Sequence, residues 1–185
     1  LRPATAGRRI ARLRRAGDPQ LRSLHLLRHP FPAPEGGPRF VKPVTVFGIG
    51  SPFGADRLGW EAIDVLTRVD DWPVPVDCHK LDRPGLALLE QLRECERAVL
   101  IDAFLARDET GVRVLSLDEL AVGSPLTTHD AGLAETLALG ERLGMLPGEL
   151  VIVGIGVVGE SMDEEVALPM PEFVDVMRGV LSKLI

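Results

Sequence analysis

The chain has 185 residues, 45% of them hydrophobic, which is enough for one domain with a sizeable core. No apolar run reaches the roughly 18 residues that a membrane-spanning helix needs, so we expect no membrane association. Aromatic residues make up only 4% of the chain and tyrosine is absent, which argues against a surface that stacks nucleic-acid bases. The two cysteines, Cys78 and Cys95, form no CxxC pair, and this usage favours a reducing, cytoplasmic setting.

Residues 1–40 differ in composition from the rest of the chain. They hold nine arginines against only Asp18 and Glu35, whereas the whole chain carries a net charge of −6, so the remainder is acidic. The stretch HPFPAPEGGPRF at 29–40 is rich in Pro and Gly, which is typical of a linker. We expect 1–40 to be a poorly ordered basic extension and 41–185 to be the folded domain. A targeting segment and a tail for an anionic partner are the alternatives for the extension.

Residues 44–60, VTVFGIGSPFGADRLGW, are the stretch around which the rest is organised. The opening VTVF predicts a strand buried on both faces, and a helical pattern begins at the closing LGW. Between them, Gly48, Gly50 and Gly54 supply a sharp turn. A strand, a turn and a helix in this order place the turn at the carboxyl edge of a parallel sheet, where open α/β folds bind ligands. Asp56 in this turn either caps the helix or points a carboxylate into the crevice.

The rest of the chain alternates strand and helix signals. Further strands are expected over 74–80, 97–104, 112–116 and 150–155, and further helices over 84–95, 130–143 and 170–184, with a loop at 117–128. Five strands interleaved with helices predict a three-layer α/β/α sandwich around a mostly parallel five-stranded sheet.

The glycine turn allows two other interpretations. GIGSPFG is GxGxxxG, not the GxGxxG of a dinucleotide site. The acidic residue that such a site carries about 20 positions further on has only Asp70 or Asp71 as candidates, and both lie in a polar break. A nucleotide-binding α/β domain and a tight turn without any ligand stay open as alternatives.

Asp102 follows four apolar residues at the end of a predicted central strand, where a carboxylate is costly unless it is hydrogen-bonded, paired or bound to a metal. It either caps the following loop or meets Asp56, because the carboxyl ends of parallel strands converge. His129, in TTHDAGL before a predicted helix, is the histidine most easily brought to the same edge, with a surface or capping role as the alternative. Two carboxylates and one imidazole would suit a borderline divalent ion such as nickel or zinc.

Motifs for covalent catalysis find little support in the sequence. There is no G-x-S-x-G elbow, no HExxH and no Walker A loop, and neither cysteine lies in a recognisable nucleophile motif. A catalytic arrangement of Ser51, His129 and Asp102 is conceivable, but no pentapeptide around the serine supports it.

Together these stretches resemble the [NiFe]-hydrogenase maturation endopeptidases. Members of that family typically read strand–G-x-G-N-P-x-x-x-D-D-x-x-G–helix, then a strand ending in DA, then [ST]-H before a helix. The corresponding stretches are GIGSPFGADRLG (48–59), VLIDAF (99–104) and TTHDAGL (127–133), and PGLALLEQL (84–92) and LGMLPGELVIVGIG (143–156) are also similar. The resemblance covers about residues 42–185.

The resemblance implies a cytoplasmic, aspartic-type endopeptidase that removes the C-terminal extension of a [NiFe]-hydrogenase large-subunit precursor after nickel insertion. It implies that Asp56, Asp102 and His129 contact the nickel and carry the chemistry, with a polarised carbonyl, an activated water and carboxylates that manage protons. The nickel would arrive with the substrate, so no tightly bound cofactor is expected. A non-proteolytic assembly factor that binds the metal-loaded precursor is the alternative from another class.

Three departures from the family pattern bear on these expectations. Ser51 stands where Asn is usual, and Ala55 replaces the first acid of the pair. The turn from Gly50 to Gly59 is one residue shorter than is common, so the alignment of Asp56 with the metal-contacting acid depends on the gap. Finally, GIGVVGE at 154–160 lacks the Pro and Glu often seen after this strand.

Overall fold

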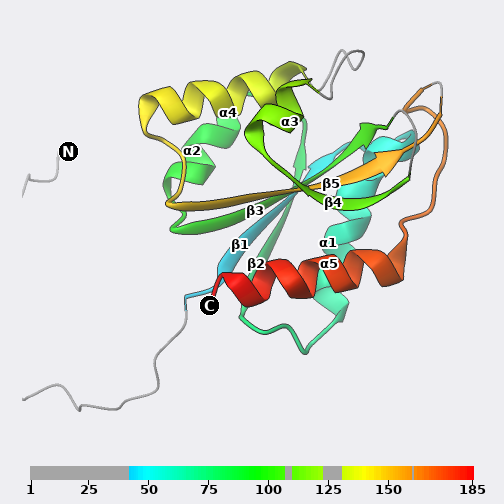
Figure 1. Ribbon diagram of the computed structural model, residues 1–185, viewed down its shortest axis with the longest axis horizontal. Helices are drawn as coiled ribbons and strands as arrows, with labels where there is room; N and C mark the ends of the chain where they lie inside the picture. The colour runs from blue at the N-terminus through cyan, green and yellow to red at the C-terminus, as the bar shows by residue number, and fades with distance from the viewer. Residues whose placement is uncertain (1–41, 107–109, 123–130, 160) are drawn as a thin grey trace, which may run out of the picture. The chain divides into compact units, whose positions relative to one another are not determined.

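A computed structural model describes residues 42–106, 110–122, 131–159 and 161–185 (Figure 1). The predicted extension at 1–40 lies outside these residues and stays a prediction. Within the described part of the chain, no helix is both long enough and apolar enough to cross a membrane.

The described residues form one five-stranded sheet with helices on both of its faces. The strands are β1 (Val44–Gly50), β2 (Val76–Asp82), β3 (Arg97–Leu105), β4 (Gly111–Leu115) and β5 (Glu149–Val157). The helices are the 3-10 helix η2 (Gly54–Arg57), α1 (Leu58–Arg68), α2 (Ala87–Arg93), α3 (Leu117–Val122), α4 (Ala131–Leu143) and α5 (Met170–Lys183). The predicted three-layer α/β/α sandwich is confirmed.

The strand order in the sheet is β2-β1-β3-β5-β4, and only the β4–β5 pair is antiparallel. The chain leaves β1 for β2 on one side and then returns to β3 on the other side of β1. The direction of winding therefore reverses between β1 and β3. In open α/β sheets, such a switch point opens a crevice at the carboxyl ends of the strands, and ligands bind there.

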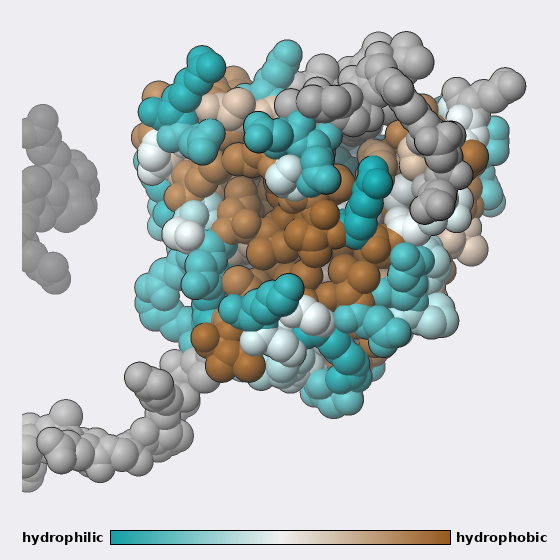
Figure 2. Space-filling view, viewed as in Figure 1, coloured by the Kyte–Doolittle hydropathy of each residue, from teal (hydrophilic) through white to brown (hydrophobic). Residues whose placement is uncertain are grey.

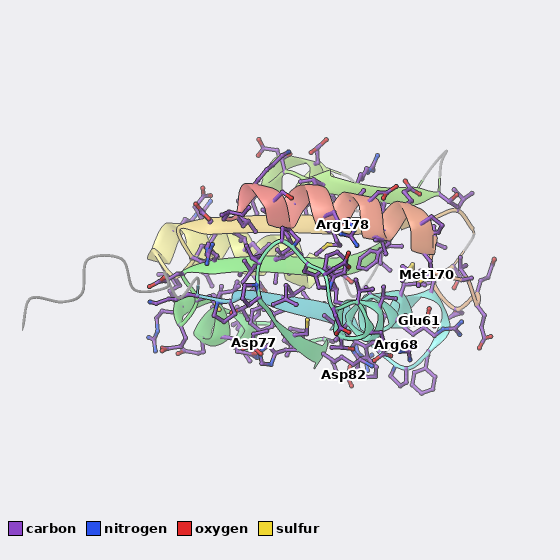
Figure 3. All side chains as sticks on the ribbon, turned by 90° about the horizontal axis from the view of Figure 1, so that it is seen from below. Glu61, Arg68, Asp77, Asp82, Met170 and Arg178 are labelled. Carbon is purple, nitrogen blue, oxygen red and sulfur yellow. The ribbon has the colours of Figure 1, made fainter. Side chains whose placement is uncertain are left out.

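Each face of the sheet has its own apolar core. Helices α1 and α5 cover one face, and α2 and α4 cover the other (Figure 1). Figure 3 shows α5, with the labelled Arg178, lying over the same face as α1. Fully buried side chains include Leu58, Leu66, Phe173 and Met177 in the first core and Leu88, Leu92 and Leu137 in the second. Figure 2 shows that hydrophobic residues also gather at the surface between α4 and α5.

The structure corrects three predicted boundaries near the crevice. β1 continues past its β-branched opening to Gly50. Gly48 and Gly50 therefore lie in the strand and not in the turn. β2 runs over Val76–Asp82 instead of 74–80. The helix predicted over 84–95 is α2 only from Ala87 to Arg93, and a turn precedes it in which the Ala87 N–H donates to the Pro84 carbonyl at 3.1 Å.

The prediction of a loop from 117 was wrong at its start, where α3 forms. The Glu119 N–H donates to Ser116 Oγ at 3.2 Å, and the Ser116 N–H donates to Glu119 Oε2 at 2.8 Å. This reciprocal pair is a capping box, which satisfies two backbone donors at the helix start. The Glu119 carboxylate accepts hydrogen bonds from the Ser116 N–H and from the Ser116 hydroxyl, and these two bonds lower the pKa of the carboxyl.

Candidate active site

Two glycines of β1 let the following helical turns pack directly on the strand backbone. A Cβ at Gly48 would lie 2.1 Å from the carbonyl oxygen of Gly59, and a Cβ at Gly50 would lie 2.0 Å from that of Asp56. Neither position can carry a side chain without moving backbone atoms. The glycines thus allow close contact between the strand and the helical turns that follow it.

The turn that holds Asp56 is fixed by a segment from much later in the chain. The Ala55 N–H donates to the Met162 carbonyl at 2.7 Å. Gly54 has a φ of +53°, and a Cβ there would lie 2.1 Å from the same carbonyl oxygen. Gly54 and Ala55 directly precede Asp56 in η2. The backbone of Met162 therefore determines where the Asp56 carboxylate lies.

Arg57 adds an ionic link between the turn, α1 and the same late segment. Its Nε donates to Glu61 Oε1 at 2.7 Å, and its Nη1 lies 3.1 Å from Glu165 Oε1. The hydrogen bond to Glu61, helped by the charges of both carboxylates, raises the pKa of the Arg57 guanidinium. Arg57 is therefore held by these partners, while its neighbour Asp56 faces the crevice.

Asp56 and Asp102 line one cavity of about 100 Å³ at the switch point. Asp102 directly follows Ile101, which pairs with Gly48 of β1, so the residue reaches the cavity from the strand next to β1. Asp102 is only 8% exposed, and its carboxylate accepts a hydrogen bond from the Ala103 N–H at 2.9 Å. Asp56 is half-buried. Both carboxylates thus reach one crevice, as their places after β1 and in β3 predict.

The sequence suggested that Asp102 ends its strand, but the structure shows that it does not. β3 continues for three residues to Leu105, because these residues pair with β5 up to Val157. The carboxylate therefore projects from a continuous part of the sheet, where backbone pairing on β5 holds it in place.

The remaining cavity wall is largely apolar, with one hydroxyl and one cation. It consists of Ile49, Arg83, Pro84, Gly85, Leu88, Gly132, Leu133 and Thr136. Thr136 is 4% exposed. The sequence reasoning missed Thr136 and Arg83. Arg83 could have been found, since it follows a strand parallel to β1 and so arrives at the same edge.

His129 lies outside the described residues, so its predicted place beside the two carboxylates stays a prediction. The helix that follows it does reach the site, because Gly132 and Leu133 of α4 line the cavity. Among the residues that the structure describes, no group of three or more His, Cys, Asp or Glu side chains could hold a metal ion. That statement does not cover the predicted set of two carboxylates and one imidazole, because His129 is not among the described residues.

The two substitutions in the turn fall on buried positions. Ala55 is fully buried and belongs to the core between the sheet and α1. An acid at that position would point into apolar surroundings, so Asp56 is the turn residue suited to present a carboxylate to the cavity. Ser51 is 4% exposed and is not among the described residues that line the cavity, so the serine-based arrangement gains no support.

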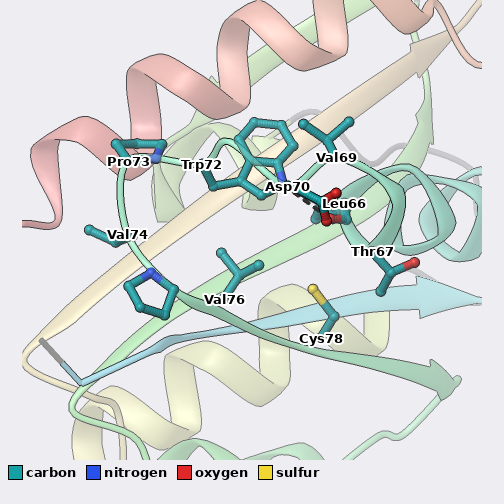
Figure 4. A pocket seen from close by; sticks show the side chains of 10 residues that line it. Leu66, Thr67, Val69, Asp70, Trp72, Pro73, Val74, Val76 and Cys78 are labelled. Carbon is teal, nitrogen blue, oxygen red and sulfur yellow. Dashed lines mark hydrogen bonds between the residues drawn. The ribbon is translucent and has the colours of Figure 1, made fainter. Parts of the chain in front are cut away.

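A larger pocket of about 550 Å³ lies elsewhere, between the end of α1 and the start of β2 (Figure 4). Its wall is mostly apolar, and the Trp72 indole N–H donates to the Leu66 carbonyl at 3.0 Å. Cys78 also lines it, and burial raises the pKa of that thiol to about 11. Asp70 is the one carboxylate among its described lining residues. The smaller cavity is therefore the candidate active site.

The fold and the site together define a three-layer α/β protein with paired carboxylates at the switch point of a mostly parallel sheet. The solved structures that share this fold include hydrogenase maturation endopeptidases. The chain is similar to the hydrogenase maturating endopeptidase HybD from E. coli, with a TM-score of 0.56 and 20% identity over 77% of this chain and 90% of that one.

Two further structures give the same result. A hydrogenase 3 maturation protease has a TM-score of 0.55 at 18% identity over 75% of this chain and 88% of that one. The [NiFe] hydrogenase maturation protease HybD from Thermococcus kodakarensis has a TM-score of 0.51 at 22% identity over 77% and 99%. No protein-family model and no curated protein match the sequence. The fold that the sequence resemblance implied is confirmed.

Proposed function

We propose that this chain is an endopeptidase that removes the C-terminal extension of a [NiFe]-hydrogenase large-subunit precursor after nickel insertion. One observation carries the proposal: Asp56 and Asp102 line a single small cavity at the switch point. Its support is that this geometry occurs in a fold shared with solved structures named as hydrogenase maturation endopeptidases. The setting we expect is the cytoplasm.

The chemistry we propose needs no nucleophile from the chain. Water adds to the scissile carbonyl carbon, the carbonyl electron pair moves to oxygen, and collapse then breaks the C–N bond. Asp102 takes the proton that the water loses and returns it to the leaving amine, which is the work of a general base and acid. A buried carboxylate held by the Ala103 N–H suits that role, because its orientation is fixed before substrate arrives.

Nickel in this proposal belongs to the precursor and is therefore part of the substrate. Asp56 and Asp102 supply oxygen ligands, and His129 supplies the nitrogen of the proposed set. A cavity of about 100 Å³ admits only a few atoms of substrate, which fits contact with a single bond or ion. We expect purified protein to hold no stoichiometric nickel after chelation and gel filtration.

The test is the intact mass of the hydrogenase large subunit from cells that lack this gene. The cells are then supplied with wild type, Asp102→Asn or, as a matched control, Asp175→Asn at an exposed position of α5. Wild type and the control should both remove the C-terminal extension, and Asp102→Asn should leave it in place. Loss of the extension in cells without the gene would refute the protease and favour an assembly factor. Full processing by Asp102→Asn would refute the role of Asp102.

A further inference from the structure

Arg83 adopts a backbone conformation that disfavours a side chain. It is the one non-glycine residue in the described chain with a positive φ, at 40°. Glycine enters this region without steric cost, as Gly85 does two residues later with a φ of 51°. A residue kept in a strained conformation where glycine would fit suggests a use for its side chain.

The position of Arg83 joins that strain to the candidate site. The residue directly follows β2, the strand beside β1, and it lines the same cavity as Asp56 and Asp102. It is the only positively charged side chain among the described residues of the cavity wall. Among the described residues of the wall, the guanidinium therefore supplies the positive charge beside two carboxylates.

Asp82 engages one nitrogen of the Arg83 guanidinium. Its Nε donates to Asp82 Oδ1 at 2.9 Å, and no hydrogen bond within the described chain engages the two terminal nitrogens. The hydrogen bond and charge of Asp82, together with the charge of Asp56, raise the pKa of Arg83 and keep it charged. Terminal guanidinium N–H groups bind carboxylate-like oxygens in a planar, paired geometry.

We propose that Arg83 binds a negatively charged oxygen of the substrate in this cavity. The inference rests on the proposed function of the site, because peptide hydrolysis beside two carboxylates creates a further negative charge. That charge is the oxyanion formed when water adds to the scissile carbonyl, and a fixed cation stabilises it. A carboxylate carried by the substrate peptide has the same chemistry, and kinetics separate the two sources.

The structure offers a variant that removes the side chain and favours the backbone. Arg83→Gly deletes the guanidinium and relieves the steric strain of a side chain at a positive φ. The urea midpoint of this variant should therefore equal or exceed that of wild type. Arg83→Asn is a second variant that tolerates the left-handed conformation. Arg83→Lys keeps the charge without the planar fork, and Arg93→Ala on α2 is the control for loss of one exposed cation outside the cavity.

The experiment measures cleavage of nickel-loaded precursor by each variant. We expect Arg83→Gly and Arg83→Asn to lower kcat/KM by at least about tenfold, Arg83→Lys to recover part of it, and Arg93→Ala to match wild type. A fall in kcat alone identifies the oxyanion, whereas a rise in KM alone identifies a substrate carboxylate. Cleavage by Arg83→Gly within about twofold of wild type would overturn the inference while leaving the proposed function intact.

A wild-type protein that does not cleave would refute the proposed function separately. The affinity of wild type and Arg83→Gly for the same nickel-loaded precursor, measured by calorimetry, then decides about Arg83. Binding that is at least about tenfold weaker in the variant supports an anionic contact, and unchanged binding overturns it.

Discussion

Two glycines with nearly the same positive φ allow the packing of the segment around Met162 against the turn at 54–57 to be measured. Gly54 and Gly85 have φ values of 53° and 51°, so changing either to Ala costs about 1–2 kcal/mol from the backbone alone. At Gly85 the new methyl group meets nothing within 4 Å. At Gly54 it would lie 2.1 Å from the Met162 carbonyl oxygen, so that segment must move. Breaking the hydrogen bond from the Ala55 N–H then adds about 1–3 kcal/mol.

Urea unfolding of both variants and wild type provides the measurement, with the slope checked for two-state behaviour. Gly54→Ala should lower the free energy of unfolding by at least about 1 kcal/mol more than Gly85→Ala does. Cleavage should fall with Gly54→Ala as well, because the displaced turn carries Asp56. Equal losses of stability would refute the idea that the segment at 162 clamps the turn.

Two more predictions concern packing and thiol chemistry. Phe173→Ala empties a fully buried position and should lower the free energy of unfolding by about 3–5 kcal/mol, whereas Phe53→Ala, at a side chain 72% exposed, should change it by less than about 0.5 kcal/mol. Similar urea midpoints for the two variants would contradict this view of the core. In Cys95→Ser protein, Cys78 is the remaining thiol, and burial, followed by the charge of Asp77, raises its pKa to about 11. Its alkylation at pH 8 should be slower than that of free cysteine by a factor on the order of 100 and should keep rising with pH above 9; a plateau near pH 9 would contradict the raised pKa.

The order of strands and helices is predictable because each element carries its own local pattern. Apolar runs of strand length, and leucines at helical spacing, depend only on neighbouring residues. Glycine contributes to neither pattern and is common in turns. The sequence therefore predicts a turn at Gly48 and Gly50, although both residues lie in β1. The cap of α3 does carry a local signal, since Ser116 and Glu119 have the spacing of a capping box.

The candidate site is predictable only where strand ends mark it. Asp56 lies in the turn after one apolar strand and Asp102 follows the apolar run of another, so their convergence follows from a parallel sheet. Nothing local marks Thr136, whose place depends on how α4 packs across the sheet. The importance of Arg83 arises from a backbone angle and from the sheet order, and neither property follows from residue spacing.

The clamp on the turn also bears on the order in which the molecule is built. The Ala55–Met162 hydrogen bond and the Arg57–Glu165 ion pair join the beginning of the described chain to its last quarter. During synthesis, β1 and α1 leave the ribosome long before their partners exist, and contacts of such separation form late. A nascent chain that ends just after β5 therefore carries both carboxylates without the segment that positions one of them. The turn that carries Asp56 can therefore take its final position only after residues 162–165 have been synthesised.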